Sequence, residues 1–492
     1  MFESAELGHK IDKKTYATEE PKLREELLNA QFDVAKAGRF PVLILIGGVD
    51  GAGKGETVNL LNEWMDPRHI QTRAFGAGSD EEAERPAMWR FWRELPPKGK
   101  IGIMFGSWYT APIVDRVMGR TSDEDLQQSL DEVVRFERML CDEGVLLLKF
   151  WFHLGKKQQK QRLKDLEKDP HTRWRVTKLD WQRFKVYDQF REISARSLRE
   201  TSTASAPWTV VEGLDERYRS LTVGRVLLES MKQRLNHAPA KASIVQVPPL
   251  PKTDNLGLVR DLDLKQKLDK AKYKKQLEKW QGSLNLLSRE KKFFKKHSLV
   301  LVFEGADAAG KGGAIRRITG AIDARHYQIT PIAAPTEEER AQPYLWRFWR
   351  HVPRRGRIAI FDRSWYGRVL VERVEELCSV ADWMRAYSEI NDFEEQLVHN
   401  GAIILKFWLQ ISKAEQLRRF KLREQIGFKT FKITPEDWRN RKKWGPYEQA
   451  VCDMIDQTST EIAPWKVIEA EDKSFARIKI LRTIVERMEG AL

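Results

Sequence analysis

Short apolar runs alternate along this chain with longer stretches in which apolar residues recur at helical spacing. In the second half, the apolar, β-branched run Leu299–Phe303 predicts a buried strand, followed by a glycine-rich turn and a helix from Ala314. Further strands are predicted at Arg357–Phe361, Ala402–Leu409 and Lys466–Ile468. This alternation predicts parallel βαβ units with helices on both faces of a sheet, an α/β fold.

The first half of the chain shows the same alternation. Its predicted strands are Val42–Ile46, Ile101–Phe105, Val145–Phe152 and Thr209–Val211. Amphipathic helices are predicted at Glu20–Ala37, near Arg225–Leu235, and at the end of the chain over Ser474–Met488. Residues 1–15 are polar and are expected to be loosely held.

Sequence motifs show that the two halves are copies of one domain. The pairs that align in register include Lys54 with Lys311, Trp89-Arg-Phe-Trp-Arg with Trp346-Arg-Phe-Trp-Arg, Ser107-Trp-Tyr with Ser364-Trp-Tyr, and Ala206-Pro-Trp with Ala463-Pro-Trp. Such a repeat decides the domain count. We expect a first copy at 1–236, a proline-rich linker at 237–254 and a second copy at 255–492.

The glycine-rich turn of the second copy has P-loop spacing, with Gly305, Gly310 and Lys311 at the characteristic positions. In such a loop backbone N–H groups surround phosphate oxygens and the lysine adds a positive charge. Gly312 stands where the common motif has a Ser or Thr that binds magnesium. The metal ligands must therefore come from elsewhere, and Asp307 within the loop is one candidate. The alternative is that Asp307 only stabilises the turn.

A second group of candidates follows the strand at 357–361. Asp362 would stand at the carboxyl end of that strand, where open parallel sheets bind ligands and an acid can hold magnesium or accept a proton. Arg363 and Arg368 could each form paired hydrogen bonds to phosphate oxygens. The alternative is a structural salt bridge between Asp362 and an arginine.

The segment from Lys406 to Lys443 is rich in lysine and arginine. Such a segment is usually a solvated helix face, but after a strand of a P-loop domain it also fits a helical lid that closes cations over phosphates. Trp346, Phe348, Trp349, Trp365 and Tyr366 could stack on a base, although aromatic residues at these spacings more often belong to a core.

Composition narrows the partner class. The 492 residues carry a net charge of +15, which suits an anionic partner such as nucleic acid, an acidic membrane or a polyanionic substrate. The three cysteines show no disulfide or metal spacing, which indicates a reducing cytoplasm. No apolar run is long enough to span a membrane, and the first residues lack the apolar core of a signal peptide.

Four motifs of the second copy resemble those of the family-2 polyphosphate kinases. They are Glu304-Gly-Ala-Asp-Ala-Ala-Gly-Lys-Gly-Gly313, Pro335-Thr-Glu-Glu-Glu339, Phe361-Asp-Arg-Ser-Trp-Tyr366 with Glu372-Arg-Val374, and Thr458-Ser-Thr-Glu-Ile-Ala-Pro-Trp465. The resemblance implies a P-loop kinase core with a lid, Mg²⁺ as cofactor and inorganic polyphosphate as donor. The fused two-copy layout resembles the branch that phosphorylates AMP to ADP.

The resemblance also implies the residues of the site. The catalytic set is Asp307, Lys311, Asp362, Arg363, Arg368, Glu372 and Arg373, with Asp307 and Asp362 as metal ligands. The predicted phosphate-binding residues come instead from the P-loop and the basic segment, and they are Gly305, Gly310, Gly312, Gly313, Lys406, Arg418, Lys421 and Arg423. No membrane or nucleic-acid partner is expected, and a homo-oligomer stays open.

The first copy departs from these motifs. Phe105, Gly106, Ala111 and Glu56 stand where the second copy has Asp362, Arg363, Arg368 and Gly313, whereas Asp50 and Lys54 are kept. We therefore predict that the first copy is catalytically silent and serves packing, assembly or polyphosphate binding. ADP as acceptor, ATP as donor and a non-catalytic polyanion binder remain alternatives for the whole chain.

Overall fold

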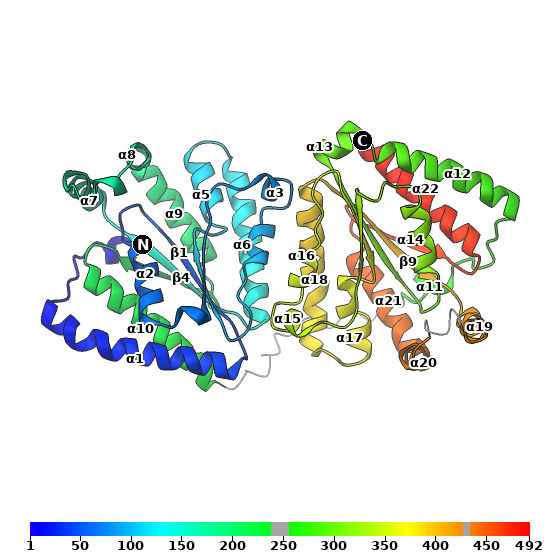
Figure 1. Cartoon of the computed structure of the whole chain (residues 1–492), viewed down its shortest axis with the longest axis horizontal. Helices are drawn as coiled ribbons and strands as arrows, with labels where there is room; N and C mark the ends of the chain where they lie inside the picture. Colours follow the sequence, from blue (N-terminus) through cyan, green and yellow to red (C-terminus); the bar gives the residue numbers. More distant parts are fainter. Residues whose placement is uncertain (238–254, 427–432) are drawn as a thin grey trace. The chain divides into compact units, whose positions relative to one another are not determined.

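The structure is a computed structural model that describes residues 1–237, 255–426 and 433–492. It divides into two compact units, which contain most of residues 1–237 and most of residues 255–492 (Figure 1). Each unit is described by itself. The expected linker at 237–254 lies, apart from His237, outside the described residues, as do residues 427–432 of the basic segment.

Each unit is built on a parallel five-stranded sheet, with strand order β2-β3-β1-β4-β5 in the first and β10-β9-β6-β8-β7 in the second. The strands of the first sheet are β1 Val42–Gly48, β2 Ile70–Ala74, β3 Ile101–Phe105, β4 Leu146–His153 and β5 Trp208–Glu212. Those of the second are β6 Ser298–Gly305, β7 Tyr327–Pro331, β8 Ile358–Asp362, β9 Ala402–Gln410 and β10 Trp465–Glu469. The tandem α/β fold is thereby confirmed.

The apolar pattern predicts four strands in each copy and misses the fifth, β2 or β7. Both missed strands lie at an edge of their sheet and pair with one neighbour only, β3 or β8. Their residues are mostly half-buried or exposed, and β2 reads Ile-Gln-Thr-Arg-Ala. An edge strand of this kind needs no continuous apolar run, so periodicity alone does not reveal it.

Helices cover both faces of each sheet (Figure 1). The helices of residues 1–237 are α1 Lys13–Ala37, α2 Lys54–Trp64, α3 Asp80–Ala83, α4 Trp89–Arg93, α5 Thr110–Val117, α6 Asp123–Asp142, α7 Lys156–Lys168, α8 Lys178–Lys185, α9 Tyr187–Thr201 and α10 Glu216–Asn236. Those of residues 255–492 are α11 Gly257–Arg260, α12 Lys270–Leu287, α13 Lys291–Lys296, α14 Lys311–Thr319, α15 Glu337–Arg340, α16 Trp346–Trp349, α17 Val371–Val374, α18 Val380–His399, α19 Lys413–Glu424, α20 Pro435–Lys442, α21 Trp444–Thr458 and α22 Lys473–Ala491. Short 3₁₀ helices lie at η1 Glu3–Ala5, η2 Pro67–His69, η3 Arg173–Arg175 and η4 Trp365–Arg368.

The expectation for the N-terminal residues is wrong. Phe2 is 1% exposed, and its ring stacks on His153 of β4 with centroids 4.4 Å apart. The entry helix α1 begins at Lys13 rather than Glu20, capped by the Asp12 carboxylate. A polar segment is thus held by one buried aromatic ring and one cap. Within the described residues, no helix has the length and apolarity needed to cross a bilayer.

Candidate active site

The glycine-rich loop of the second unit joins β6 directly to α14 and forms the expected P-loop. Gly305 and Gly310 have positive φ angles of 152° and 115°, and a Cβ on Gly305 would lie 2.7 Å from the carbonyl oxygen of Leu409. Glycine is therefore required for this close approach to β9. The Lys311 Nζ donates to the carbonyl oxygen of Gly305 at 2.6 Å. The lysine thus curls over the loop, beside a helix N-terminus that favours anions.

Asp307 lies within this loop and is held from two sides. Its Oδ1 lies 3.2 Å from Nη2 of Arg363, and its Oδ2 accepts a hydrogen bond from Nδ2 of Asn440 at 3.0 Å. Its backbone carbonyl accepts from Nε2 of Gln416 at 3.2 Å. The structure therefore brings Asp307 and Arg363 together and adds Asn440, on α20, which sequence analysis missed.

Asp362 ends β8 in register with Phe303 of β6, at the same sheet edge as the P-loop. Among the described residues, no hydrogen bond or ion pair engages its carboxylate. Glu304, the residue before Gly305, is buried and accepts a hydrogen bond from Ser364 Oγ at 2.8 Å. Burial raises the pKa of Glu304, although Lys311 lies close enough to oppose that shift.

Glu304 stood within the quoted motif but received no role from the sequence. The available signal was an acidic residue at the end of an otherwise apolar strand. Burial in a sheet normally excludes an unpaired carboxylate unless a nearby charge or hydrogen bond compensates. Glu304 therefore belongs to the same charged cluster as Asp307, Lys311, Asp362 and Arg363.

Three further predicted residues lie on η4 and α17, just after the end of β8. Nη1 of Arg368 lies 3.0 Å from Oε2 of Glu372. Arg373 makes a 2.7 Å ion pair with Asp453 of α21, and its guanidinium lies 4.2 Å from the centroid of the Trp383 ring. The Arg373 guanidinium is therefore engaged by residues of α18 and α21.

Helix α20 and the residue that follows it contact this region through a carboxylate that the sequence did not reveal. Glu375 is only 7% exposed at its side chain and receives Lys443 at 3.0 Å and Arg439 at 3.1 Å. The hydroxyl of Tyr447 also donates to Asn440 Oδ1 at 3.2 Å. A chain of contacts therefore runs from Glu375, just after α17, through Tyr447 and Asn440 to Asp307.

The basic residues of α19 fall into different environments. Arg418 is exposed and pairs with Glu415 at 2.7 Å, and Lys421 is also exposed. Arg423 is half-buried, and burial lowers its pKa. Arg419 is buried, and its guanidinium donates to the carbonyl oxygens of Ala308 and Ala309 at 2.9 Å. Arg419 therefore braces the P-loop backbone.

Lys406 does not belong to the phosphate site as predicted. Its side chain is fully buried, and its Nζ contacts Glu394 Oε2 at 2.8 Å, the Tyr366 hydroxyl at 2.9 Å and the Thr458 carbonyl at 2.6 Å. These contacts use all three ammonium donors. The aromatic residues considered as base-stacking partners are also core residues, because Trp346, Phe348, Trp349, Trp365 and Tyr366 are all buried.

The first unit keeps the loop and its lysine but lacks the strand-end acid, and a different set of charged residues surrounds the loop. Lys54 Nζ donates to the Gly48 carbonyl at 2.6 Å and lies 3.2 Å from Asp50 Oδ1. Phe105 ends β3 where Asp362 ends β8. The Glu56 carboxylate, in the first turn of α2, forms ion pairs with Arg219 at 2.7 Å, Arg162 at 3.3 Å and Arg175 at 3.5 Å.

Comparison with known proteins agrees with this arrangement. The family model described as polyphosphate kinase 2 matches residues 10–239 and 267–492. A Polyphosphate:AMP phosphotransferase of Pseudomonas aeruginosa is 61% identical over 497 aligned positions, covering 100% of this chain and 99% of the relative. A Polyphosphate:AMP phosphotransferase of Acinetobacter johnsonii is 36% identical and covers 96% of each chain.

A solved structure shows the same fold over the whole chain. The crystal structure of a Pseudomonas aeruginosa protein assigned to polyphosphate kinase 2 superposes with a TM-score of 0.91 at 59% identity, covering 100% of this chain and 99% of that one. The family match extends over both repeats and includes both P-loops. This chain therefore belongs to the polyphosphate kinase 2 family.

Proposed function

We propose that this chain transfers a phosphoryl group from inorganic polyphosphate to AMP, giving ADP, and that its second unit performs the transfer. The observation that carries the proposal is the cluster of Lys311, Asp307, Asp362 and Arg363 at one edge of the second sheet. The full-length relatives named above, both Polyphosphate:AMP phosphotransferases, support the choice of donor and acceptor.

In this proposal positive groups neutralise the charge of the transferring phosphoryl group. Phosphoryl transfer depends mainly on positioning and electrostatic stabilisation. Lys311 and the N-terminus of α14 would hold donor phosphates, with the lysine leaving the Gly305 carbonyl for a phosphate oxygen. Arg363 and Arg368 would contact the transferring group, and Glu372 would orient Arg368 through their 3.0 Å ion pair.

The donor set of the site fits Mg²⁺. The described residues contain no group of three His, Cys, Asp or Glu side chains that could hold a metal alone. Asp307 and Asp362 offer two carboxylates, however, and Mg²⁺ commonly binds one or two carboxylates together with substrate phosphates and water. Bound there, the ion would neutralise phosphate charge, while Asn440 and Arg363 keep the Asp307 carboxylate in place.

The first unit is proposed to be catalytically silent. Phe105 offers no metal ligand, and Gly106 and Ala111 supply no cation. Loss of these groups removes the charge stabilisation on which phosphoryl transfer depends. A cytoplasmic location is also proposed, and the three free cysteines, Cys141, Cys378 and Cys452, are consistent with it.

The test is a nucleotide assay without ATP. Purified protein, Mg²⁺ and polyphosphate are incubated with AMP in one tube and ADP in another. ADP formation from AMP is expected, and Lys311→Ala should abolish it while the matched Lys54→Ala leaves it nearly unchanged. ATP formed only in the ADP tube would change the acceptor. Activity only when ATP replaces polyphosphate would overturn the proposed donor, and equal losses in the two lysine variants would overturn the assignment to the second unit.

A further inference from the structure

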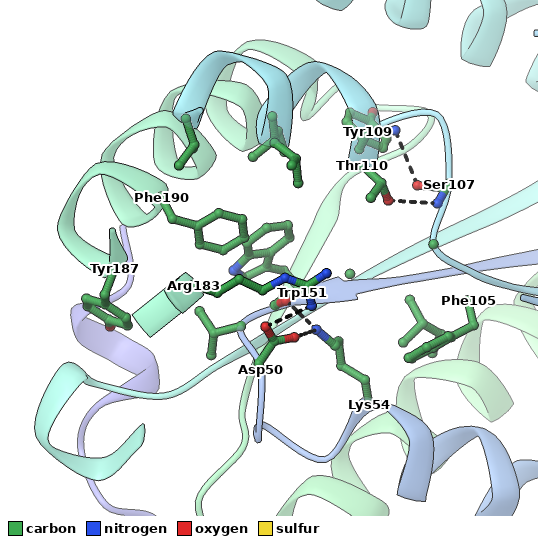
Figure 2. Close-up of a pocket in the computed structure, with 18 of the residues that line it drawn as sticks. Asp50, Lys54, Phe105, Ser107, Tyr109, Thr110, Trp151, Arg183, Tyr187 and Phe190 are labelled. Carbon is green, nitrogen blue, oxygen red and sulfur yellow. Dashed lines mark hydrogen bonds and ion pairs between the residues drawn. The ribbon is translucent and has the colours of Figure 1, made fainter. Parts of the chain in front are cut away.

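A cavity of about 310 Å³ opens in the first unit beside its P-loop. Figure 2 shows Asp50, Lys54 and Arg183 together, with the rings of Phe105, Trp151 and Phe190 around them. The volume of this cavity lies at the lower end of the range for small-molecule sites, roughly 300–1,000 Å³. The volume therefore suits a compact ligand.

At several positions the wall of this cavity is apolar, whereas the equivalent position of the second unit carries a charged residue. Five uncharged lining residues have charged counterparts in the repeat: Gly47 corresponds to Glu304, Phe105 to Asp362, Gly106 to Arg363, Met118 to Glu375 and Val186 to Lys443. Together with Ile113, Val114 and Val117 of α5, these residues form a surface that suits a flat, apolar part of a ligand. A chain of phosphates would lose its water there without gaining partners.

Positive charge remains at one point of the cavity. Lys54 lies 3.2 Å and Arg183 lies 3.3 Å from the single carboxylate of Asp50. Burial opposes ionisation of Asp50, but Lys54 and Arg183 outweigh it and lower its pKa. Two cations and one anion leave an excess of one positive charge. The neighbouring arginines 162, 175 and 219 share the single carboxylate of Glu56 and are not lining residues of the cavity.

Two buried polar atoms of the lining have no partner among the described residues. They are Nε1 of Trp151, a side chain 3% exposed, and Oε1 of Gln159, which is 5% exposed. Both residues line the cavity. Buried polar atoms are nearly always hydrogen-bonded, so an orphaned donor and an orphaned acceptor in one lining call for an explanation.

The second unit shows that these atoms can be satisfied internally. There Trp408 Nε1 donates to Gln410 Oε1 at 2.7 Å, and Gln416 Oε1 accepts from Arg441 at 3.2 Å. In the first unit the positions of Gln410 and Arg441 are taken by His153 and Phe184. Both internal partners are therefore missing in the unit that contains this apolar cavity.

We infer that this cavity binds a nucleoside monophosphate, with the heteroaromatic base among the apolar walls and the single phosphate at Lys54 and Arg183. The base edge supplies the acceptor and the donor that Trp151 and Gln159 lack. Rings such as Phe190 and Trp151, which are stacked with centroids 5.9 Å apart, suit a planar ligand. AMP is chosen as the ligand to test because of the proposed function. The inferred ligand class, in contrast, rests on the residues of the cavity alone.

The test is photolabelling of the full chain with an azido derivative of AMP, followed by mapping of the labelled peptides. Labelled peptides from α5 or α9 are expected, with the label displaced by AMP but not by adenosine or tripolyphosphate. Label confined to the second unit, or displaced from the first unit by tripolyphosphate, would overturn the inference.

Substitutions test whether the labelled site is the cavity of the first unit. Arg183→Ala should reduce labelling of the first unit by about tenfold or more, because the loss of a charge-assisted hydrogen bond changes affinity by about that factor. Val114→Trp, which fills the cavity, should do the same, and Lys311→Ala should not. Unchanged labelling in both first-unit variants would overturn the inference. Label in the first unit without turnover of AMP would overturn only the proposed function, and turnover without that label would overturn only the inferred site.

Discussion

The guanidinium of Arg363 lies 3.2 Å from the carboxylate of Asp307, so that one ion pair joins the P-loop to the end of β8. Arg363 holds this position with a φ of 63°, a left-handed backbone conformation that residues other than glycine rarely adopt. The equivalent Gly106 of the first unit has a φ of 76°. Both units share this backbone corner, but only the second places a cation there at the cost of strain, as functional sites often do.

Replacement of Arg363 should therefore separate activity from stability. Arg363→Gly is expected to lower kcat by about 10²–10³-fold, the usual loss when one group that stabilises transition-state charge is removed. Its unfolding temperature should not fall, because glycine relieves about 1 kcal/mol of left-handed strain. Steady-state kinetics and thermal unfolding measure the two effects.

Arg363→Ala is the matched control. It removes the guanidinium but keeps a Cβ in the left-handed region, so it should lose the same activity and be less stable than Arg363→Gly. Near-normal turnover in either variant would show that Arg363 serves only as a structural partner of Asp307.

Asp307→Asn should change the metal requirement. An amide keeps the shape of the side chain and one of the two oxygens that accept from Asn440 and Arg363, but it removes the charge that a divalent cation needs. The Mg²⁺ concentration for half-maximal rate should rise by about tenfold or more, as expected for loss of a charged ligand. A titration of rate against Mg²⁺ measures this, with Asp50→Asn as the control from the first unit. An unchanged titration curve would leave Asp307 with a bracing role only.

The P-loop and the strand-end acid were predictable because each is encoded by adjacent residues, and the repeat was predictable because the same motifs recur in register in both halves of the chain. Asn440 and Glu375 were not, since each joins the site through contacts between distant segments: Asn440 with Asp307, and Glu375 with Lys443. Lys406 was misassigned for the same reason. A lysine inside an apolar strand suggests a site residue, and its buried partner Glu394 is identified only by the structure. The burial of Phe2 was likewise not predictable, because a single aromatic residue forms no periodic pattern.

Burial of Glu304 predicts a pH effect on stability. Burial raises its pKa above the ordinary value of 4.5. The folded state therefore holds this proton to higher pH than the unfolded state does. The stability of the protein should fall, through this group, as pH rises from about 4.5 through the folded pKa.

Glu304→Gln removes this titration. The variant should gain stability relative to the parent chain at pH 7, and the gain should shrink as pH falls through the folded pKa towards about 4.5. Urea unfolding at several pH values measures the difference. Asp323→Asn is a control of opposite sign, because hydrogen bonds from Arg325 lower the pKa of Asp323, whose stabilising effect is lost as pH falls. A stability difference for Glu304→Gln that does not vary with pH would contradict the assigned shift.

The buried pair of Lys406 and Glu394 should govern stability rather than phosphate binding. Both side chains are almost wholly inaccessible, and the first unit repeats the arrangement with Lys149 and Glu137 at 2.7 Å. Lys406→Met would leave the Glu394 carboxylate in the core without its cation, a change that typically destabilises by about 3–5 kcal/mol. We expect Lys406→Met to lower the unfolding transition of the second unit and Lys149→Met that of the first. Added Glu394→Gln should recover part of the loss, because it removes the unpaired charge. A Lys406→Met protein with normal stability and a raised KM for polyphosphate would return Lys406 to the phosphate site.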